Sequence, residues 1–305
     1  YEEAKAAIDF GADIELLCAR VPHGRLVLLL DEIEYVTFDL SPAEHWQDDF
    51  LSMWATLRSV HQNSRGKFSF IVAGVNPYAT ERHRIGNHDN PLFSTTGTFF
   101  VSPLTREHTA QMIRSLGRMM GISVDRPLID SMYASFGGHP FLTRRACSHL
   151  SKSLPDRPAV MTGGLWESHR VDVGQALGPI ATQILTVLES WYPTEYELLQ
   201  ALAQGDTNTF SDFARSSAEF CSHVVGYGLV ADPLTAPSFT IGLVADVLRR
   251  MAVEAGSEDE RSGVPDDAPQ PEDDDSYWDS ILGEISRRRN RLERDLRRRA
   301  KMTLE

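Results

Sequence analysis

The sequence has few cysteines, and none of them lies in a metal-binding or redox pattern. Its three cysteines, Cys18, Cys147 and Cys221, are far apart and fall inside predicted helices, so we expect reduced thiols rather than a disulfide framework. No secretory leader is recognisable, and no apolar run is long enough to span a bilayer. These absences predict a cytoplasmic protein without a membrane partner.

Positive charge is also scarce over most of the chain. The formal net charge is −13. Residues 1–253 contain 28 acidic and 20 basic side chains, a difference of −8. This charge argues against general binding of nucleic acid by this part of the chain. Contact with DNA is therefore possible only locally, and we do not favour it.

The most informative absence is that of a phosphate-binding loop. The pattern G-x-x-x-x-G-K-[ST], which cradles nucleotide phosphates, occurs nowhere in the 305 residues. The chain opens at Tyr1, already within a helical pattern, so we expect the missing strand and loop to lie upstream in a longer protein. On its own, this piece is expected to be inactive as an enzyme.

A buried strand that ends in two acids is predicted at residues 25–32, RLVLLLDE. Five consecutive apolar residues are typical of a parallel strand buried on both faces. Asp31 and Glu32 follow where such a strand leaves the sheet. In P-loop ATPases, the first acid at such a strand end holds Mg²⁺, usually through water, and the second can orient or deprotonate the water that attacks the γ-phosphate. A core strand with an acidic exit is the alternative.

A second strand is predicted at residues 67–74, KFSFIVAG, after a helix over residues 41–61. It ends just before Asn76, so a polar side chain again reaches the edge at which open α/β sheets bind ligands. Asn76 resembles the sensor residue of AAA-type and related ATPases, a polar side chain that faces the γ-phosphate and its attacking water, and an Asn-Pro turn is the alternative. A third short strand is predicted at residues 98–101.

A glycine pair separates two further predicted helices. One helix is expected over residues 125–136, Gly137 and Gly138 end it, and His139 and Pro140 begin the next. Glycine after a helix and proline in a first turn are ordinary signals for helix ends. Taken alone, the pattern is that of a plain junction between two helices.

Three helices and a hairpin are predicted in residues 171–253. The helices are expected over residues 179–191, 193–202 and 211–226, and the hairpin over residues 226–241. This order is typical of a winged-helix domain. The third helix is the one that would enter a DNA groove, but its acids balance its few bases, so we expect it to pack within the protein.

The composition changes sharply after residue 253. Residues 254–275 contain ten acids and one base with almost no apolar side chain, so burial cannot offset the entropy of ordering them and we predict a disordered linker. Residues 276–305 contain nine basic and five acidic residues and repeat Leu and Ile on one helical face. This pattern predicts the start of a C-terminal helical module.

In their order and spacing, these motifs resemble those of the STAND class of P-loop ATPases, particularly prokaryotic members with a GGHP lid. The segments that carry the resemblance are LVLLLDE, FIVAGVNP, FVSPLT and FGGHPFL. The resemblance implies an α/β P-loop NTPase core with a partial parallel sheet, then a helical lid and a winged-helix domain. The implied bounds are 1–103 for the ATPase part, 104–170 for the lid, 171–253 for the winged helix, 254–275 for the linker and 276–305 for the C-terminal module.

The resemblance also implies a role for each candidate residue. Asp31 would hold Mg²⁺ through water, Glu32 would be the catalytic acid, and Asn76 would sense the γ-phosphate. His139 and Pro140 would contact the adenine side of bound ATP or ADP. Many relatives carry an arginine motif where this chain has Asn76, so the sensor assignment departs from the class pattern.

The function implied by the resemblance is a signalling switch. ADP would hold the lid and winged helix closed, and exchange for ATP after an unidentified trigger would open the protein, allow homo-oligomers to form and control a C-terminal effector. In bacteria such switches often serve antiviral defence. Two alternatives stay open: a DNA-binding initiator or regulator ATPase with a winged helix, and a scaffold that does not hydrolyse nucleotide.

We expect limited proteolysis to cut the chain first between residues 254 and 275, because this segment has too little apolar surface to fold. Mass spectrometry of the early fragments locates the cut. Protection of this segment equal to that of residues 171–253 would contradict the prediction.

Overall fold

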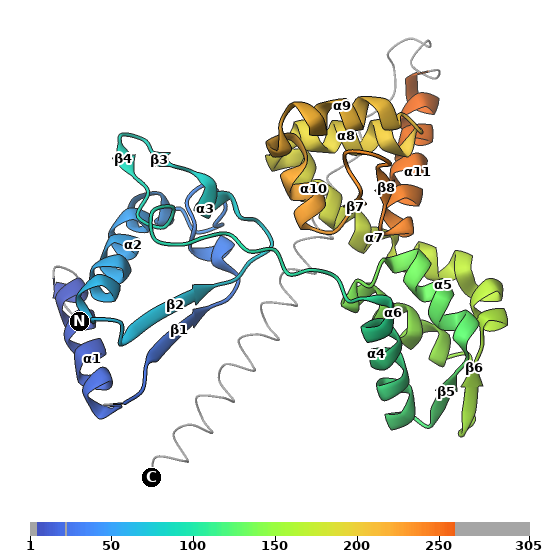
Figure 1. The fold of residues 1–305 in the computed structure, drawn as a ribbon, viewed down its shortest axis with the longest axis horizontal. Helices are drawn as coiled ribbons and strands as arrows, with labels where there is room; N and C mark the ends of the chain where they lie inside the picture. The colour runs from blue at the N-terminus through green and yellow to red at the C-terminus, as the bar shows by residue number, and fades with distance from the viewer. Residues whose placement is uncertain (1–4, 22, 260–305) are drawn as a thin grey trace, which may run out of the picture. The chain divides into compact units, whose positions relative to one another are not determined.

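The computed structural model describes residues 5–21 and 23–259 (Figure 1). Two hydrophobic cores organise this part of the chain. The first gathers buried residues between positions 14 and 92, and the second gathers those between positions 110 and 248. Both cores belong to the compact unit that ends at Glu254. The predicted C-terminal module, residues 276–305, and most of the predicted linker lie outside the described residues.

Short strands and helices alternate in the N-terminal part. Its elements are α1 (Ala6–Arg20), β1 (Leu26–Leu30), the 3₁₀ turn η2 (Ile33–Val36), α2 (Trp46–Asn63), β2 (Phe68–Val72), α3 (Tyr78–Glu81), β3 (Arg84–Ile85) and β4 (His88–Asp89).

The first core lies between a parallel strand pair and a helix. β1 and β2 pair in parallel, with Leu26 opposite Phe68 and Leu30 opposite Val72. α2 packs on β2 and on α1, and its Phe50 and Trp54 are almost wholly buried. The predicted order of strand, helix and parallel strand is confirmed.

The opposite face of this strand pair is open. Val27 is 46 % exposed, Leu29 is 70 % exposed and Ile71 is 59 % exposed, whereas the alternate residues of β1 are partly buried against the first core. The prediction that β1 is buried on both faces is therefore wrong for the described residues, which cover only one face. Since a continuous apolar run is typical of a doubly covered strand, the open face is unusual.

Two predicted elements in this region differ from the structure. The helix predicted from residue 41 begins at Trp46, because residues 41–45 form turns in which the Ser41 hydroxyl accepts from the Ala43 amide at 3.1 Å. Residues 98–101 form no strand, and Phe99 is 84 % exposed. Within the described residues no strand pairs with this segment, and an unpaired strand is not stable.

The middle of the chain is mainly helical. Its elements are α4 (Arg106–Met119), β5 (Ile122–Val124), α5 (Arg126–Phe136), α6 (Pro140–Ser151), β6 (Ala159–Met161) and α7 (Gly163–Trp191).

Capping side chains explain where these helices start. Thr105, Asp125, His139 and Thr162 each accept a hydrogen bond from the backbone amide three residues later, which satisfies a donor that the first turn leaves unpaired. α5 ends at Gly137, whose φ is 57°. The predicted helix over residues 125–136 and the new helix at His139 and Pro140 are confirmed.

α7 is longer than predicted. A helix was expected to begin at Pro179, but α7 starts at Gly163 and carries Pro179 in its interior, so the proline does not open a helix here. The predicted boundary between lid and winged helix, after residue 170, falls inside α7. By length and composition α7 is also able to cross a membrane, although its buried residues, such as Val173 and Leu185, belong to the second core.

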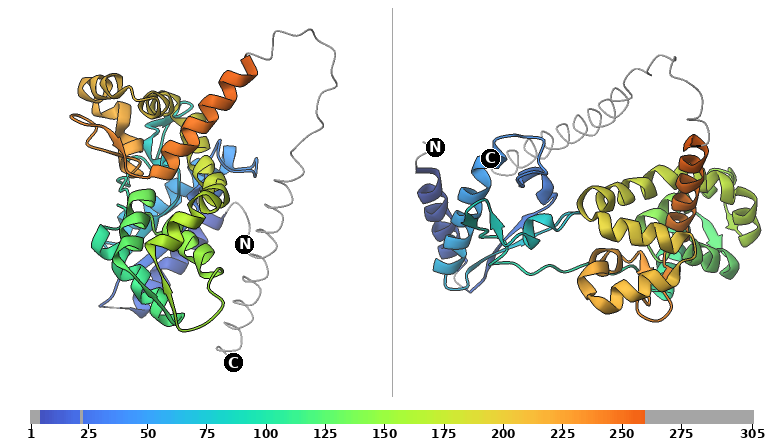
Figure 2. Two further views of the ribbon diagram at one scale, coloured as in Figure 1. Left: turned by 90° about the vertical axis from the view of Figure 1, so that its right-hand side faces the viewer. Right: turned by 90° about the horizontal axis from the view of Figure 1, so that it is seen from above.

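The last described elements follow the predicted order of helices and hairpin (Figure 2). They are α8 (Pro193–Ala203), α9 (Thr207–Ser216), η3 (Ala218–Cys221), α10 (Ser222–Gly226), β7 (Val230–Ala231), β8 (Ser238–Phe239) and α11 (Gly242–Asp259).

Two details of this order differ from the prediction. The single helix expected over residues 211–226 is three short ones, because Ser217 adopts an extended backbone with φ −156° and ψ 133° and caps η3. The antiparallel pairing of β7 and β8 confirms the predicted hairpin. α11 continues to Asp259, so the first six residues of the predicted linker are helical.

Gly138, in the α5–α6 junction, gives a direct test of how closely this junction packs on Leu104. Its φ is 79°, and a Cβ there would lie 1.9 Å from the Leu104 carbonyl oxygen, whereas Gly205, with φ 92°, has open space around it. Left-handed backbone costs a residue with a Cβ about 1–2 kcal/mol, and overpacking adds about 1–3 kcal/mol. Gly138→Ala should therefore lower the free energy of unfolding by about 2 kcal/mol more than Gly205→Ala. Urea unfolding measures both, and equal losses would contradict the packing.

Candidate functional site

The ends of β1 and β2 meet at one edge of the strand pair. The Leu30 carbonyl accepts from the Ala73 amide at 2.8 Å, and the Ala73 carbonyl accepts from the Ile33 amide at 3.0 Å. These bonds extend the ladder beyond both strands. The acids that follow β1 and the residues that lead to Asn76 consequently leave the sheet side by side.

Asp31 and Glu32 are both exposed at this edge. Glu32 has φ 54° and ψ 52°, a left-handed conformation that is uncommon for a residue other than glycine. Its amide donates to Asp31 Oδ1 at 3.0 Å, which helps to stabilise the sharp turn into η2. Among the described residues, the Glu32 carboxylate has no hydrogen-bond partner. It is thus available to a ligand or to water.

Glu34, which the sequence analysis did not single out, binds the segment that follows β2. Its Oε1 accepts from the Asn76 amide at 2.7 Å and also from the Val75 amide. Gly74 makes this approach possible, because a Cβ there would lie 2.5 Å from the same oxygen. Gly74, at the end of a β-prone run, was the sequence signal that could have indicated a close contact at this position.

Asn76 is buried, with 4 % of its surface exposed. Its Oδ1 accepts from the Tyr78 amide at 3.0 Å and from the Tyr192 hydroxyl at 3.1 Å. Within the described part of the chain, its side-chain nitrogen makes no hydrogen bond. The arrangement leaves an N–H donor free, which is the group needed to contact a phosphate oxygen or an attacking water.

His139 and Pro140 lie at the start of α6. His139 Nδ1 accepts from the Leu142 amide at 3.4 Å, and burial lowers the pKa of His139, which keeps that nitrogen available as an acceptor. Pro140 is exposed beside Phe141, which is 48 % exposed. No hydrogen bond or ring contact among the described residues joins this pair to the strand-end acids, so the structure does not bring the two predicted halves of the site together.

Asp31 is suited to the Mg²⁺ that was predicted there. Mg²⁺ commonly keeps several waters and takes one or two carboxylates together with substrate phosphates, so a single exposed carboxylate is a sufficient protein ligand. No cluster of three or more His, Cys, Asp or Glu side chains in the described residues is arranged to hold a metal ion by itself. Asp31 remains a predicted ligand.

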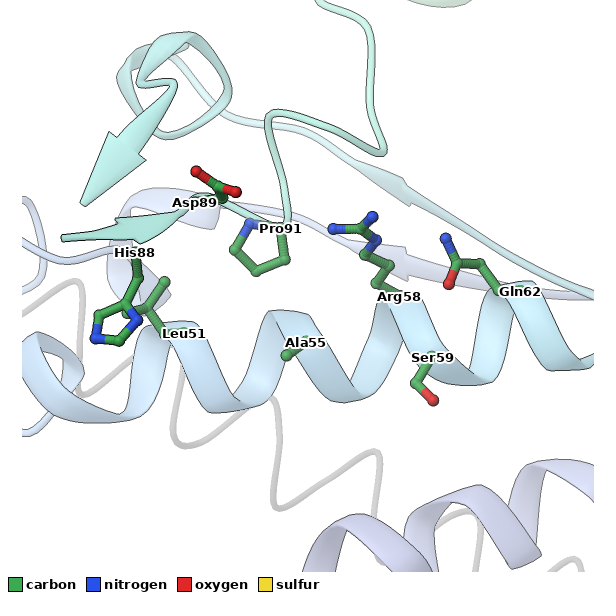
Figure 3. A pocket seen from close by; sticks show the side chains of 8 residues that line it. All are labelled: Leu51, Ala55, Arg58, Ser59, Gln62, His88, Asp89 and Pro91. Carbon is green, nitrogen blue, oxygen red and sulfur yellow. The ribbon is translucent and has the colours of Figure 1, made fainter. Parts of the chain in front are cut away.

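Two hollows in the described part lie away from these residues. One of about 400 Å³ lies between α2 and the β3–β4 hairpin (Figure 3), and one of about 920 Å³ lies between α1 and α2. The first is lined by Leu51, Ala55, Arg58, Ser59, Gln62, His88, Asp89 and Pro91. Neither hollow contains a predicted site residue.

Comparison with solved structures identifies the fold. The Walker-type ATPase of Pyrococcus abyssi is similar with a TM-score of 0.53 at 13 % identity, over 78 % of this chain and 66 % of that protein. The δ protein of the Bacillus subtilis DNA clamp loader (10 % identity, 80 % and 74 % coverage) and the branch-migration motor RuvB of Thermotoga maritima (14 % identity, 84 % and 76 % coverage) both give 0.30, too low to carry an argument. The sequence matches no protein-family model and no curated protein.

The chain therefore has a P-loop NTPase fold, as predicted. It spans slightly less than two thirds of the length of the Pyrococcus protein. At 13 % identity the likeness shows the fold alone, so the STAND class, the lid and the winged helix remain predictions, as do the site residues, the ligands, the partners and the cytoplasmic location.

The contacts of Glu34 generate a prediction for the sensor segment. Glu34→Ala removes the acceptor for two backbone amides, and a hydrogen bond to a charged group contributes about 1.5–3 kcal/mol. We expect faster hydrogen exchange at residues 75–76 and a loss of about 1–3 kcal/mol in the free energy of unfolding. Glu44→Ala, at an exposed acid, is the matched control. Identical exchange in the two variants would show that Glu34 does not hold this segment.

Proposed function

We propose that this chain is the later part of a STAND-type signalling ATPase, in which a nucleotide controls the position of a helical lid and a winged-helix domain. The observation that supports it best is the shared edge at which two acids and a buried asparagine leave a parallel strand pair. That arrangement occurs in a chain with a P-loop NTPase fold.

Each strand-end residue has a distinct proposed part in ATP hydrolysis. Asp31 holds Mg²⁺ through water, and the ion, when bound, neutralises charge on the phosphates. Glu32 orients or deprotonates the attacking water with its free carboxylate. Asn76 donates from its unpaired side-chain nitrogen to the γ-phosphate or to that water. Glu34 keeps the Asn76 backbone in place.

A phosphate-binding loop must come from outside the 305 residues in this proposal. The open apolar face of Val27, Leu29 and Ile71 supports that requirement, because parallel sheets are ordinarily covered on both faces. A segment whose helix covered this face and whose strand paired with β1 would place its own strand end beside Asp31. The complete site would then combine residues from both segments.

The proposed switch works through the later elements. His139 and Pro140 contact the adenine in the closed, ADP-bound form, and ATP exchange after an unidentified trigger releases the lid and winged helix. The released protein forms homo-oligomers and controls a C-terminal effector. The class resemblance alone supports antiviral defence as the biological role.

A DNA-binding regulator receives less support than a switch. α9 offers Arg215 as its basic side chain, and Arg215 is already paired with Asp212 at 3.0 Å and with the Leu234 carbonyl at 2.7 Å. Recognition of a DNA backbone requires several basic side chains that are free to contact phosphates. A scaffold that does not hydrolyse nucleotide is the remaining alternative. Measured rates of ATP hydrolysis can distinguish it from a switch.

The proposed chemistry predicts how two substitutions differ. The 305-residue chain alone should bind ATP weakly or not at all. In a polypeptide that also carries a phosphate-binding loop, Glu32→Gln should keep ATP bound but slow hydrolysis by about 10²- to 10⁴-fold, and Asp31→Ala should weaken Mg²⁺-dependent binding. Glu44→Gln, at an exposed acid that is not part of the proposed site, serves as the control. Equal hydrolysis by wild type and Glu32→Gln would remove Glu32 from the chemistry and favour the scaffold.

A further inference from the structure

An ionic cluster connects α10 to the segment that carries Asn76. His223 Nδ1 lies 2.5 Å from Glu195 Oε1 of α8, and His223 Nε2 lies 2.8 Å from Glu81 Oε1 of α3. His223 is 8 % exposed and Glu195 is 4 % exposed. Since both ring nitrogens face carboxylates, both must carry a proton, and the ring is an imidazolium. It bridges two acids that are 114 positions apart in the sequence.

Tyr192, at the junction of α7 and α8, extends this bridge to the candidate sensor. Its ring stacks on the His223 ring with centroids 3.5 Å apart and an angle of 23°. Its hydroxyl lies 3.1 Å from Asn76 Oδ1 and 3.0 Å from Glu81 Oε2, and its single proton is shared between these two acceptors. Stacking on a ring that is itself fixed at both nitrogens restrains where the hydroxyl points.

Further contacts cover the His223 side of this cluster, whereas the Glu81 side chain is 34 % exposed. The Tyr227 hydroxyl donates to the Val75 carbonyl at 2.8 Å. Phe100 packs edge-on against the rings of both His223 and Tyr227, and Gly226 leaves the space for it, because a Cβ there would lie 2.7 Å from the Phe100 ring. The hydrogen bond between the buried His223 and Glu195 gains strength in such surroundings.

We propose that Tyr192 is a positioning residue for Asn76 and that the Glu81–His223–Glu195 bridge is the latch that holds Tyr192 in place. With Asn76 Oδ1 occupied by Tyr192 and by the Tyr78 amide, the side-chain nitrogen is the end left to face a nucleotide. The role of Asn76 rests on the proposed function, whereas the latch is a property of the fold.

The latch has a consequence for the proposed switch. When the helical elements move away from the strand pair, Tyr192 leaves with them and the Asn76 side chain loses the partner that orients it. Preorganised donors contribute strongly to catalysis because they need no rearrangement during the reaction. The open state should therefore hydrolyse ATP slowly, which prolongs the signal after opening.

The bridge makes the latch sensitive to pH. Burial lowers the pKa of His223, but hydrogen bonds and charge attraction from Glu195 and Glu81 outweigh burial and raise it to about 9. A histidine in an unfolded chain titrates near about 6.5, so the stabilisation by the imidazolium is complete below about pH 6.5 and is lost as the pH rises through about 9. A neutral ring has one N–H and can keep only one of the two bonds.

The other titratable groups that face the cluster do not compete with His223. Burial, together with nearby carboxylates, raises the pKa of Tyr192 and of Tyr227. Burial and Glu195 also raise the pKa of Cys221 in η3. All three groups therefore tend to stay neutral while the imidazolium loses its proton.

Hydrogen exchange of the 305-residue chain tests the latch without nucleotide. At pH 7, His223→Gln and Glu81→Gln should lower protection factors at residues 76–82 by about tenfold or more, as expected for loss of a charged hydrogen bond, while β1 keeps its protection. Wild type should lose protection at residues 76–82 between pH 7 and pH 9.5, and His223→Gln should not. His169→Gln, whose ring bonds Ser153 and Ser168 outside the cluster, is the control.

The possible outcomes decide between a latch and a general loss of stability. Equal loss of protection at β1 would mean that the variants simply unfold, and protection of the wild type that does not change with pH would overturn the latch.

In the polypeptide with a phosphate-binding loop, Tyr192→Phe keeps the ring but not the hydroxyl, and should lower kcat by about threefold to tenfold with KM for ATP unchanged. If Tyr192→Phe keeps the wild-type kcat while Glu32→Gln is inactive, the positioning role of Tyr192 is overturned and the proposed function still stands.

Discussion

Parallel hydrogen bonding between β1 and β2 is the constraint on which the candidate site depends. Two strands that run in the same direction necessarily end at the same edge, and the added bonds at Ala73 keep the chain in register past both strands. An antiparallel pair would place Asp31 and Asn76 at opposite edges. The direction of one strand pair thus decides whether the acids and the asparagine are neighbours at all.

The local parts of the site were predictable because they depend on residues close in the sequence. An apolar run followed by Asp31 and Glu32 indicates a strand exit whatever surrounds it, and His139 caps α6 through an amide three residues away. These two inferences need only periodicity and capping chemistry. The P-loop NTPase fold was implied by the resemblance of the motifs, in their order and spacing, to a known class of ATPases.

The contacts that hold the site were not predictable from the sequence, because they join distant residues of ordinary local pattern. Glu34 and Asn76 are 42 positions apart, Tyr192 and Asn76 are 116 apart, and His223 and Glu81 are 142 apart. His223 falls within the single helix that was predicted over residues 211–226. Nothing near it in the sequence indicates two carboxylate partners, which come from α3 and α8.

The continuity of α7 through Pro179, where the sequence predicted a helix start, has the same origin. A proline normally begins or ends a helix, yet Pro179 lies inside α7, whose buried residues contribute to the second core on both sides of it. Tertiary packing therefore outweighs the local signal, and a single helix extends from the predicted lid into the predicted winged helix. Because Tyr192 directly follows this helix, a displacement of α7 along its axis moves the tyrosine as well. The packing that outweighs the local signal thus connects the predicted lid elements, through one continuous helix, to the residue that contacts Asn76.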